Sequence, residues 1–306
     1  MSIGERRPGV AGDGGEAARL DAALPDIDWS IAPVGTVFSR FPAPSGELAV
    51  ASLGDPADPR VVMVPGATGS KEDFYLLAPI LVAAGYYVQS YDLAGQYESA
   101  DAGPPPGGHY TYDLLVADFV AFLSDGGAAH VLGYSFAGIV AELALVEHPD
   151  LFRSLTLLTT PPEPGQAFRG VRVIGWLSWL LNGHQGAGLM IWGIVTNKNK
   201  VPPSRLAFVR SRFDLTRRSS VDDMVGLMKR VPDVRARVAA SGIPVLVATG
   251  DHDLWPTPLH AANADALGAR LAVYRTGHSP CETAPHQLAR DMIALFREAD
   301  ARDAAG

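Results

Sequence analysis

Residues 132–145, LGYSFAGIVAELAL, place a serine between a short apolar run and a helix-like run. Small residues surround Ser135, with Gly133 before it and Ala137 and Gly138 after it. A strand that turns sharply into a helix needs small residues at such positions, because its two arms approach closely. The turn would hold the serine in an uncommon backbone conformation, and such strained residues cluster at active sites. The stretch therefore predicts a serine nucleophile between a strand and a helix.

The composition indicates a folded protein that does not bind nucleic acid. The chain has 306 residues, of which 47% are hydrophobic and 19% charged, and its formal net charge is -8. This length suits one large domain or two smaller ones. An acidic surface repels phosphate backbones, so we expect no nucleic-acid partner. The single cysteine, Cys281, excludes an intrachain disulfide and a metal site built from several cysteines.

The N-terminal residues have no apolar core of the signal-peptide kind, and we expect a cytoplasmic protein. Residues 1–30 are rich in glycine and charge, so we expect them to form a mobile tail. The most apolar stretch, residues 173–195, is interrupted by Asn182, His184 and Gln185, and we do not expect it to span a membrane. Contact with a membrane surface is a weaker alternative that this stretch leaves open.

Strand-like and helix-like segments alternate along most of the chain. Residues 35–55 are predicted to form a hairpin that turns at Pro-Ser-Gly. Further strands are expected at residues 60–66, 86–95, 128–133, 154–160, 243–250 and 270–277, and helices at residues 71–84, 112–123, 139–147 and 285–298. The strands are nearly continuous apolar runs, which is typical of strands covered on both faces. The pattern predicts an α/β fold with a mostly parallel, doubly wound sheet.

One long segment interrupts this alternation. Residues 161–240 show helical patterns and no convincing strand. We expect them to form a helical cap inserted between the two parts of the α/β core, residues 31–160 and 241–300. Because the segment lies between two strands of the sheet, it would cover the carboxyl ends of the strands.

Two other strands end in residues that could assist the serine. A hydroxyl is a poor nucleophile until an adjacent base takes its proton, and a third group must orient that base. The strand at residues 243–250 is followed by Asp251 and Asp253, and the strand at residues 270–277 is followed by His278. The carboxyl ends of parallel strands meet at one edge of a sheet, where such folds carry their sites.

These segments resemble the α/β-hydrolase family, whose nucleophile turn is usually Gly-x-Ser-x-Gly. Here Ala137 stands at the second glycine. The resemblance implies that Ser135 is the nucleophile, Asp253 the acid and His278 the base, in the chain order Ser, Asp, His. Asp251 is the rival candidate for the acid. A serine at this turn sets the chain apart from the dehalogenases and epoxide hydrolases of the family, which use an aspartate there.

The same resemblance implies an oxyanion hole. Residues 62–74, VMVPGATGSKEDF, follow the third expected strand, where the family often carries His-Gly-x; Pro65 replaces the histidine. By resemblance, the backbone N–H groups of Ala67 and Phe136 would hold the oxyanion. The stretch lacks the Gly-Lys-Ser/Thr ending of a phosphate loop, so we expect neither a nucleotide nor another cofactor. No pattern of metal ligands is evident.

The expected cap is rich in aromatic and apolar side chains, which favours an uncharged, hydrophobic small molecule as substrate. The candidate substrate contacts are Tyr97, Trp176, Trp179, Trp192 and Trp255. Arg205, Arg210 and Arg212 could bind a charged group instead, but their spacing fits a solvated helix face better.

We therefore expect a serine hydrolase that cleaves an ester-like bond through an acyl-enzyme. The same three residues could also serve C–C bond hydrolysis, lactone opening or acyl transfer. The alternative from another class is a ligand receptor that uses the same fold with little turnover. The sequence sets neither the acyl group, nor the alcohol, nor the oligomeric state.

Overall fold

The computed structural model describes residues 15–171, 183–196 and 201–303. Its strands form a single sheet in the order β1-β2-β4-β3-β5-β6-β7-β8. In chain order they are β1 (Val37–Ala43), β2 (Gly46–Leu53), β3 (Arg60–Val64), β4 (Tyr87–Tyr91), β5 (Ala129–Tyr134), β6 (Phe152–Leu158), β7 (Val245–Gly250) and β8 (Arg270–Tyr274). β2 runs antiparallel to β1 and to β4, and all other neighbours are parallel. The predicted mostly parallel sheet is confirmed.

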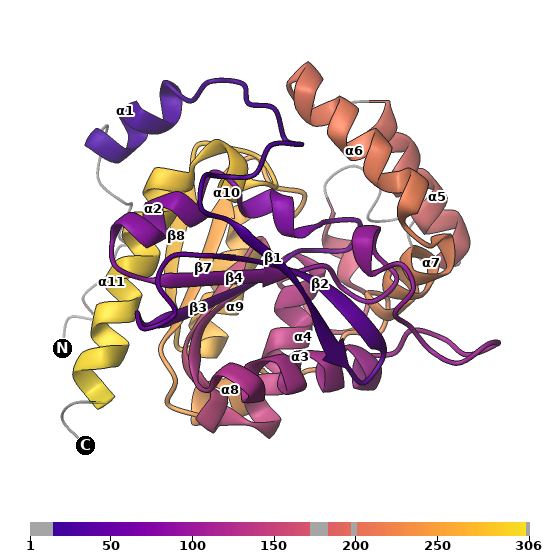
Figure 1. Ribbon diagram of the computed structural model, residues 1–306. Coiled ribbons are helices and arrows are strands. Elements are labelled where there is room, and N and C mark those ends of the chain that lie inside the picture. Colours follow the sequence, from indigo (N-terminus) through magenta and orange to yellow (C-terminus); the bar gives the residue numbers. More distant parts are fainter. Residues whose placement is uncertain (1–14, 172–182, 197–200, 304–306) are drawn as a thin grey trace.

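Helices cover both faces of this sheet (Figure 1). They are α2 (Ala78–Ala83), α3 (Tyr112–Gly126), α4 (Phe136–Glu147), α8 (Arg235–Ala240), α9 (Thr257–Leu267), α10 (Pro280–Thr283) and α11 (Pro285–Asp303). Alternate residues of a strand point to opposite faces, and β3 divides its side chains in this way. Val62 and Val64 pack in the apolar cluster that includes α3 and α4, and Val61 and Met63 pack in the cluster that includes α2 and α11. The doubly wound fold follows from strands that are apolar on both sides.

The segment that we expected to be one helix over residues 71–84 is broken in two. A single 3₁₀ turn, Lys71–Phe74, comes first, and α2 begins only at Ala78. The N–H of Lys71 donates to Asp92 Oδ1 at 2.8 Å, and its ammonium group contacts the same carboxylate. These bonds hold the start of the segment against the loop after β4.

Part of the expected N-terminal tail is ordered, which corrects the prediction for residues 16–22. They form α1 (Glu16–Ala22), which packs against α11. The carboxylate of Asp21 accepts hydrogen bonds from the backbone N–H groups of His286 and Gln287 at 2.8 and 3.1 Å. The first N–H groups of a helix have no partner within it, so Asp21 caps α11 from a distant part of the chain.

Within the described part of residues 161–240, the structure contains helices and no named strand. They are α5 (Gly183–Val195), α6 (Pro203–Leu215) and α7 (Arg218–Leu227), followed by α8. Figure 1 shows α5, α6 and α7 together at one end of the sheet. The division of the chain into a core and a cap at residues 161–240 stays a prediction. None of the helices described has both the length and the apolar character needed to cross a bilayer.

Candidate active site

Ser135 is the single residue between the end of β5 at Tyr134 and the start of α4 at Phe136. Its φ is +51°, a left-handed value that serine adopts only where its surroundings hold it there. Gly138 permits the turn, because a Cβ at this position would collide with the side chain of Thr160. The N–H of Ser135 donates to the carbonyl of Leu158 at 2.8 Å, which fixes the turn to β6. The structure thus places the serine on a strained strand-to-helix turn.

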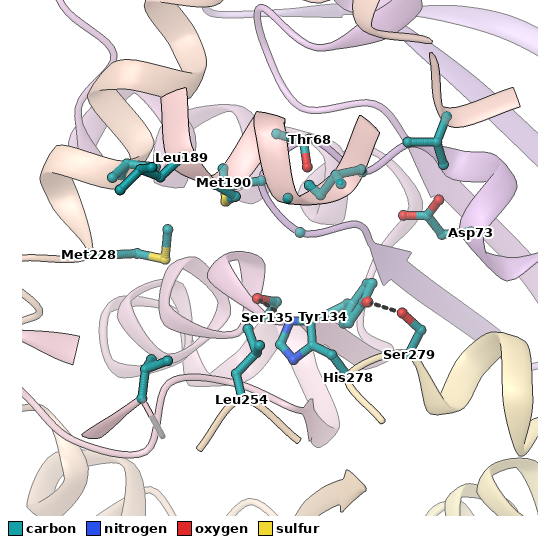
Figure 2. Close-up of a pocket in the computed structure, with 18 of the residues that line it drawn as sticks. Thr68, Asp73, Tyr134, Ser135, Leu189, Met190, Met228, Leu254, His278 and Ser279 are labelled. Atoms are coloured by element: carbon teal, nitrogen blue, oxygen red, sulfur yellow. Dashed lines mark hydrogen bonds between the residues drawn. The ribbon is translucent and has the colours of Figure 1, made fainter. Parts of the chain in front are cut away.

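His278 and Asp253 complete a chain of hydrogen bonds that begins at this serine. His278 Nε2 lies 3.1 Å from Ser135 Oγ, and His278 Nδ1 lies 2.5 Å from Asp253 Oδ1. Asp253 follows the end of β7, and His278 follows the end of β8. The Asp253 side chain is fully buried, whereas 22% of the His278 side chain is exposed. Figure 2 shows the imidazole of His278 beside Ser135 at the edge of a cavity.

Asp253 is held as a carboxylate by its neighbours. Burial raises the pKa of this carboxyl group, but the charge of His278 and hydrogen bonds from His260 and His278 keep the pKa well below its ordinary value. The rival acid, Asp251, lies near the surface and contacts the exposed His252, with 2.6 Å between Oδ1 and Nδ1. Of the two candidate acids, the structure brings Asp253 to the imidazole of His278.

A second histidine, His260, also contacts the predicted acid, and no motif in the sequence singles it out. It lies on α9, seven residues after Asp253, and its Nε2 is 2.7 Å from Asp253 Oδ2. Its side chain is fully buried. The one signal in the sequence is a histidine on the helix that follows the predicted acid.

The loop after β3 lies directly against the serine. A Cβ on Gly66 would lie 3.0 Å from the Ser135 Cβ, closer than an ordinary van der Waals contact, so glycine favours this approach. The next residue is Ala67, one of the two predicted oxyanion donors. The other, Phe136, is the first residue of α4, and the first N–H groups of a helix have no partner within it. This placement is compatible with two donors beside Ser135, and their role stays a prediction.

Two further hydrogen bonds hold the loop that carries His278. Thr159 Oγ1 donates to the backbone carbonyl of His278 at 2.9 Å. The hydroxyl groups of Tyr134 and Ser279 lie 2.8 Å apart, a contact drawn in Figure 2. Burial raises the pKa of Tyr134 well above its usual value, so this phenol stays neutral. Hydrogen bonds at His278 and at the next residue, Ser279, therefore hold this loop in the absence of substrate.

Ser135 and His278 open into a cavity of about 470 Å³. Most of its lining side chains are apolar: Phe168, Val171, Leu189, Met190, Ile194, Val201, Leu206, Val209, Val225, Met228 and Leu254. Figure 2 shows Met228, Leu189 and Met190 on one side of the cavity and Asp73 on the other. A cavity of this size and composition suits a small, largely apolar molecule.

The predicted substrate contacts have different outcomes. Trp192 and Trp255 line the cavity, and the Trp255 ring lies 5.9 Å from the ring of His278. Tyr97 lines a separate hollow, where it packs on Phe208 of α6. This corrects its predicted role, because the 3₁₀ turn after Gly95 directs Tyr97 toward α6. Trp176 and Trp179 lie outside the described residues.

The cap arginines differ most from their predicted solvated setting. Arg205 and Arg212 are buried on α6, where Nη2 of Arg205 lies 2.5 Å from Asp73 Oδ1 and 2.7 Å from Glu282 Oε1. Arg212 Nη1 lies 2.6 Å from the same Asp73 oxygen. Burial raises the pKa of Asp73, but the two guanidinium groups hold the pKa below its ordinary value. Only Arg210, the third arginine, is exposed as predicted.

We call these four buried charges, Asp73, Arg205, Arg212 and Glu282, the cap clamp. Asp73 lies on the 3₁₀ turn after β3 and Glu282 lies on α10, so the clamp ties α6 to both of these elements. In the described parts of the chain, no three His, Cys, Asp or Glu side chains gather closely enough to hold a metal ion.

Comparison with known proteins gives a family match and a partly aligned curated relative. A sequence model of the alpha/beta hydrolase family matches residues 61–291, more than half of the chain. Rhodomycin D methylesterase DnrP of Streptomyces peucetius is 34% identical over 112 residues, which are 35% of this chain and 36% of the relative. The chain thus spans about a third of that relative's length in this alignment.

Solved structures share the fold at lower identity. A carboxylesterase of the thaumarchaeon Nitrososphaera gargenis superimposes with a TM-score of 0.67 at 18% identity, covering 86% of this chain and 100% of that one. The epoxide hydrolase VrEH1 of Vigna radiata gives a TM-score of 0.69 at 16% identity, covering 86% and 98%. The resemblance predicted from the sequence is confirmed: the chain belongs to the alpha/beta hydrolase family.

Proposed function

We propose that this chain is a serine esterase acting on small, neutral, largely apolar esters. The observation that carries the proposal is the run of contacts from Ser135 Oγ through His278 to Asp253, at 3.1 and 2.5 Å. A hydroxyl, an imidazole and a buried carboxylate in this order are what acyl transfer to serine requires. The esterase-type relatives are compatible with it, since one of them is named a methylesterase.

The chemistry would proceed in two halves. In the first, Ser135 Oγ attacks the ester carbonyl while His278 Nε2 takes its proton, and His278 then gives that proton to the departing alcohol. In the second, water attacks the acyl-enzyme, His278 again takes a proton, and the proton returns to Ser135 as the acid leaves. Asp253 accepts from Nδ1–H throughout, which holds the imidazole in the tautomer whose Nε2 can act as a base.

A negative charge develops on the carbonyl oxygen during the attack, and hydrogen-bond donors that are already in place stabilise it. The N–H groups of Ala67 and Phe136 would supply them, from the loop after β3 and from the first turn of α4. Such donors are worth about 2.7–4 kcal/mol each in serine hydrolases, because they need not reorganise during the reaction. The positive end of the α4 dipole adds to the same effect.

Product release kinetics test the proposal against a receptor of the same fold. A nitrophenyl ester of a short fatty acid should give a burst of nitrophenol equal to the enzyme concentration, followed by slower turnover. Ser135→Ala should show no burst, whereas Ser124→Ala, which removes an exposed hydroxyl on α3, should behave like the wild type. Binding of the ester without any release of nitrophenol would contradict the enzyme and favour the receptor.

A further inference from the structure

The carboxylate of Asp253 lies between two imidazoles. His278 contacts its Oδ1 from the loop after β8, and His260 contacts its Oδ2 from α9 at 2.7 Å. Asp253 and His260 both have fully buried side chains. The arrangement uses both oxygens of the acid, one for the base and one for a second histidine.

The chemistry of the two groups decides which of them donates the hydrogen bond between His260 and Asp253. An ionised carboxylate can only accept hydrogen bonds, so His260 Nε2 must carry the proton. The other ring nitrogen of His260, Nδ1, is buried and has no hydrogen-bond partner within residues 15–171, 183–196 and 201–303. Leaving a polar atom buried in this way costs about 1–3 kcal/mol, which an apolar residue would avoid. Among the residues that the structure describes, the side chain that this imidazole bonds is Asp253.

We propose that His260 is a positioning residue of the active site, acting through Asp253. Its N–H fixes the plane of the carboxylate, so that Oδ1 faces His278 Nδ1. It also keeps the carboxylate charged, because a buried carboxylate oxygen without a donor favours the neutral acid. A neutral Asp253, or one rotated about χ2, would no longer hold His278 in its working tautomer. The inference rests on the proposed function for its effect on turnover, but its effect on the Asp253–His278 bond can be observed without substrate.

Three substitutions separate this role from simple packing. His260→Leu keeps an apolar volume and removes the donor. His260→Gln keeps a donor, since its amide nitrogen reaches the position of the imidazole Nε2, whereas the amide of His260→Asn is too short to reach Asp253. The control is His252→Gln, which removes an imidazole from a similar contact with Asp251 at the surface. The full chain is used throughout, and thermal denaturation shows which variants fold.

The first readout is the kinetic constants for a neutral nitrophenyl ester. His260→Leu and His260→Asn should lower kcat about 10- to 100-fold, the usual effect of removing an outer partner of an active-site group, with KM changed by less than about 3-fold. His260→Gln and His252→Gln should stay within about 3-fold of wild type. If the leucine variant does not fold, the matched pair of His260→Gln and His260→Asn decides.

The second readout is the proton NMR signal of the Asp253–His278 hydrogen bond. A proton in a short bond between imidazole and carboxylate resonates far downfield, and we expect this signal in wild type and in His260→Gln. It should be lost or shifted upfield in His260→Leu and His260→Asn. An unchanged signal in a folded His260→Asn variant, or equal kcat for His260→Asn and His260→Gln, would overturn the inference. Because the signal needs no turnover, it decides the role of His260 even if Ser135 proves not to react.

Discussion

His278 Nδ1 lies 2.5 Å from Asp253 Oδ1, whereas Asp251, only two residues before Asp253, contacts His252 at the surface. The two acids leave the same strand, but only one of them is buried against the imidazole beside Ser135. The resemblance to the family had favoured Asp253, which stands three residues after the glycine that ends the strand, with Asp251 as its rival.

This difference predicts unequal effects of removing each acid. Asp253→Asn should lower kcat by about 10³- to 10⁴-fold, because its single amide oxygen can accept from only one of His260 and His278, and an amide N–H turned toward Nδ1 changes the tautomer of His278. Asp251→Asn should lower kcat by less than about 2-fold, since this side chain is partly exposed and contacts His252, whereas Asp253 is the acid that binds His278. Steady-state kinetics of both purified variants provide the comparison. Equal losses, or a larger loss in Asp251→Asn, would move the role to Asp251.

The cap clamp predicts a large difference between two arginines of one helix. Arg205→Leu removes the partner shared by Asp73 and Glu282, and breaking a buried ion pair costs about 3–5 kcal/mol. Arg210→Leu removes an exposed side chain that bonds the carbonyl of Val195, and should cost less than about 0.5 kcal/mol. Urea denaturation gives the free energy of unfolding of each variant. A loss below about 1 kcal/mol in Arg205→Leu would show that the clamp does not hold the cap on the core.

Glu142 on α4 predicts a pH dependence of stability. Burial raises the pKa of Glu142 to about 8, and the charge of Arg235 lowers it only in part. In the unfolded chain a glutamate titrates near about 4.3. Between these two values the folded protein holds a proton that the unfolded chain has lost, so the free energy of unfolding falls as pH rises from about 4 to about 8.

Glu142→Gln removes this titration. The variant should match the wild type near pH 4 and be more stable at pH 8, which thermal denaturation at the two pH values can measure. Glu147→Gln, at the exposed end of the same helix, is the control and should change neither melting temperature. A Glu142→Gln variant less stable than wild type at pH 8 would contradict a buried, proton-holding Glu142.

The cavity predicts discrimination between neutral and charged esters. The positive charges of Arg205 and Arg212 are already compensated by Asp73 and Glu282, so they would attract a carboxylate on the substrate only weakly. The rest of the lining is mostly apolar, and burying an unpaired charge there is costly. We expect kcat/KM to be at least about 10-fold higher for a butyrate ester than for the matching succinate half-ester. A preference for the succinate would make the cap arginines a recognition element.

The parts of the fold that could be predicted are those that local patterns specify. Apolar runs such as the one in β3 identify buried strands, and small residues around Ser135 identify the strained turn. The order of strand ends along the chain then brings Asp253 and His278 to the same edge as the serine. These features depend on residues close together in the sequence, or on a topology that parallel sheets share.

The features that could not be predicted depend on distant partners. Arg205 and Arg212 are seven positions apart and share a helix face, but their acids lie more than 60 residues away, so the face was interpreted as solvated. His260 looks like any polar residue of an amphipathic helix until Asp253 is known to face it. The helix at residues 16–22 is likewise recognisable only from its contact with α11.

The measurement that tests the account most directly is covalent labelling of the serine. A fluorophosphonate probe reacts with an activated serine hydroxyl, with loss of fluoride, and mass spectrometry of the digested protein locates the adduct. We predict a stoichiometric adduct on Ser135, none in Ser135→Ala, and strongly slowed labelling in His278→Ala, because the hydroxyl then lacks its base. An adduct at another residue, or full ester turnover by Ser135→Ala, would contradict the central claim that Ser135 is the nucleophile.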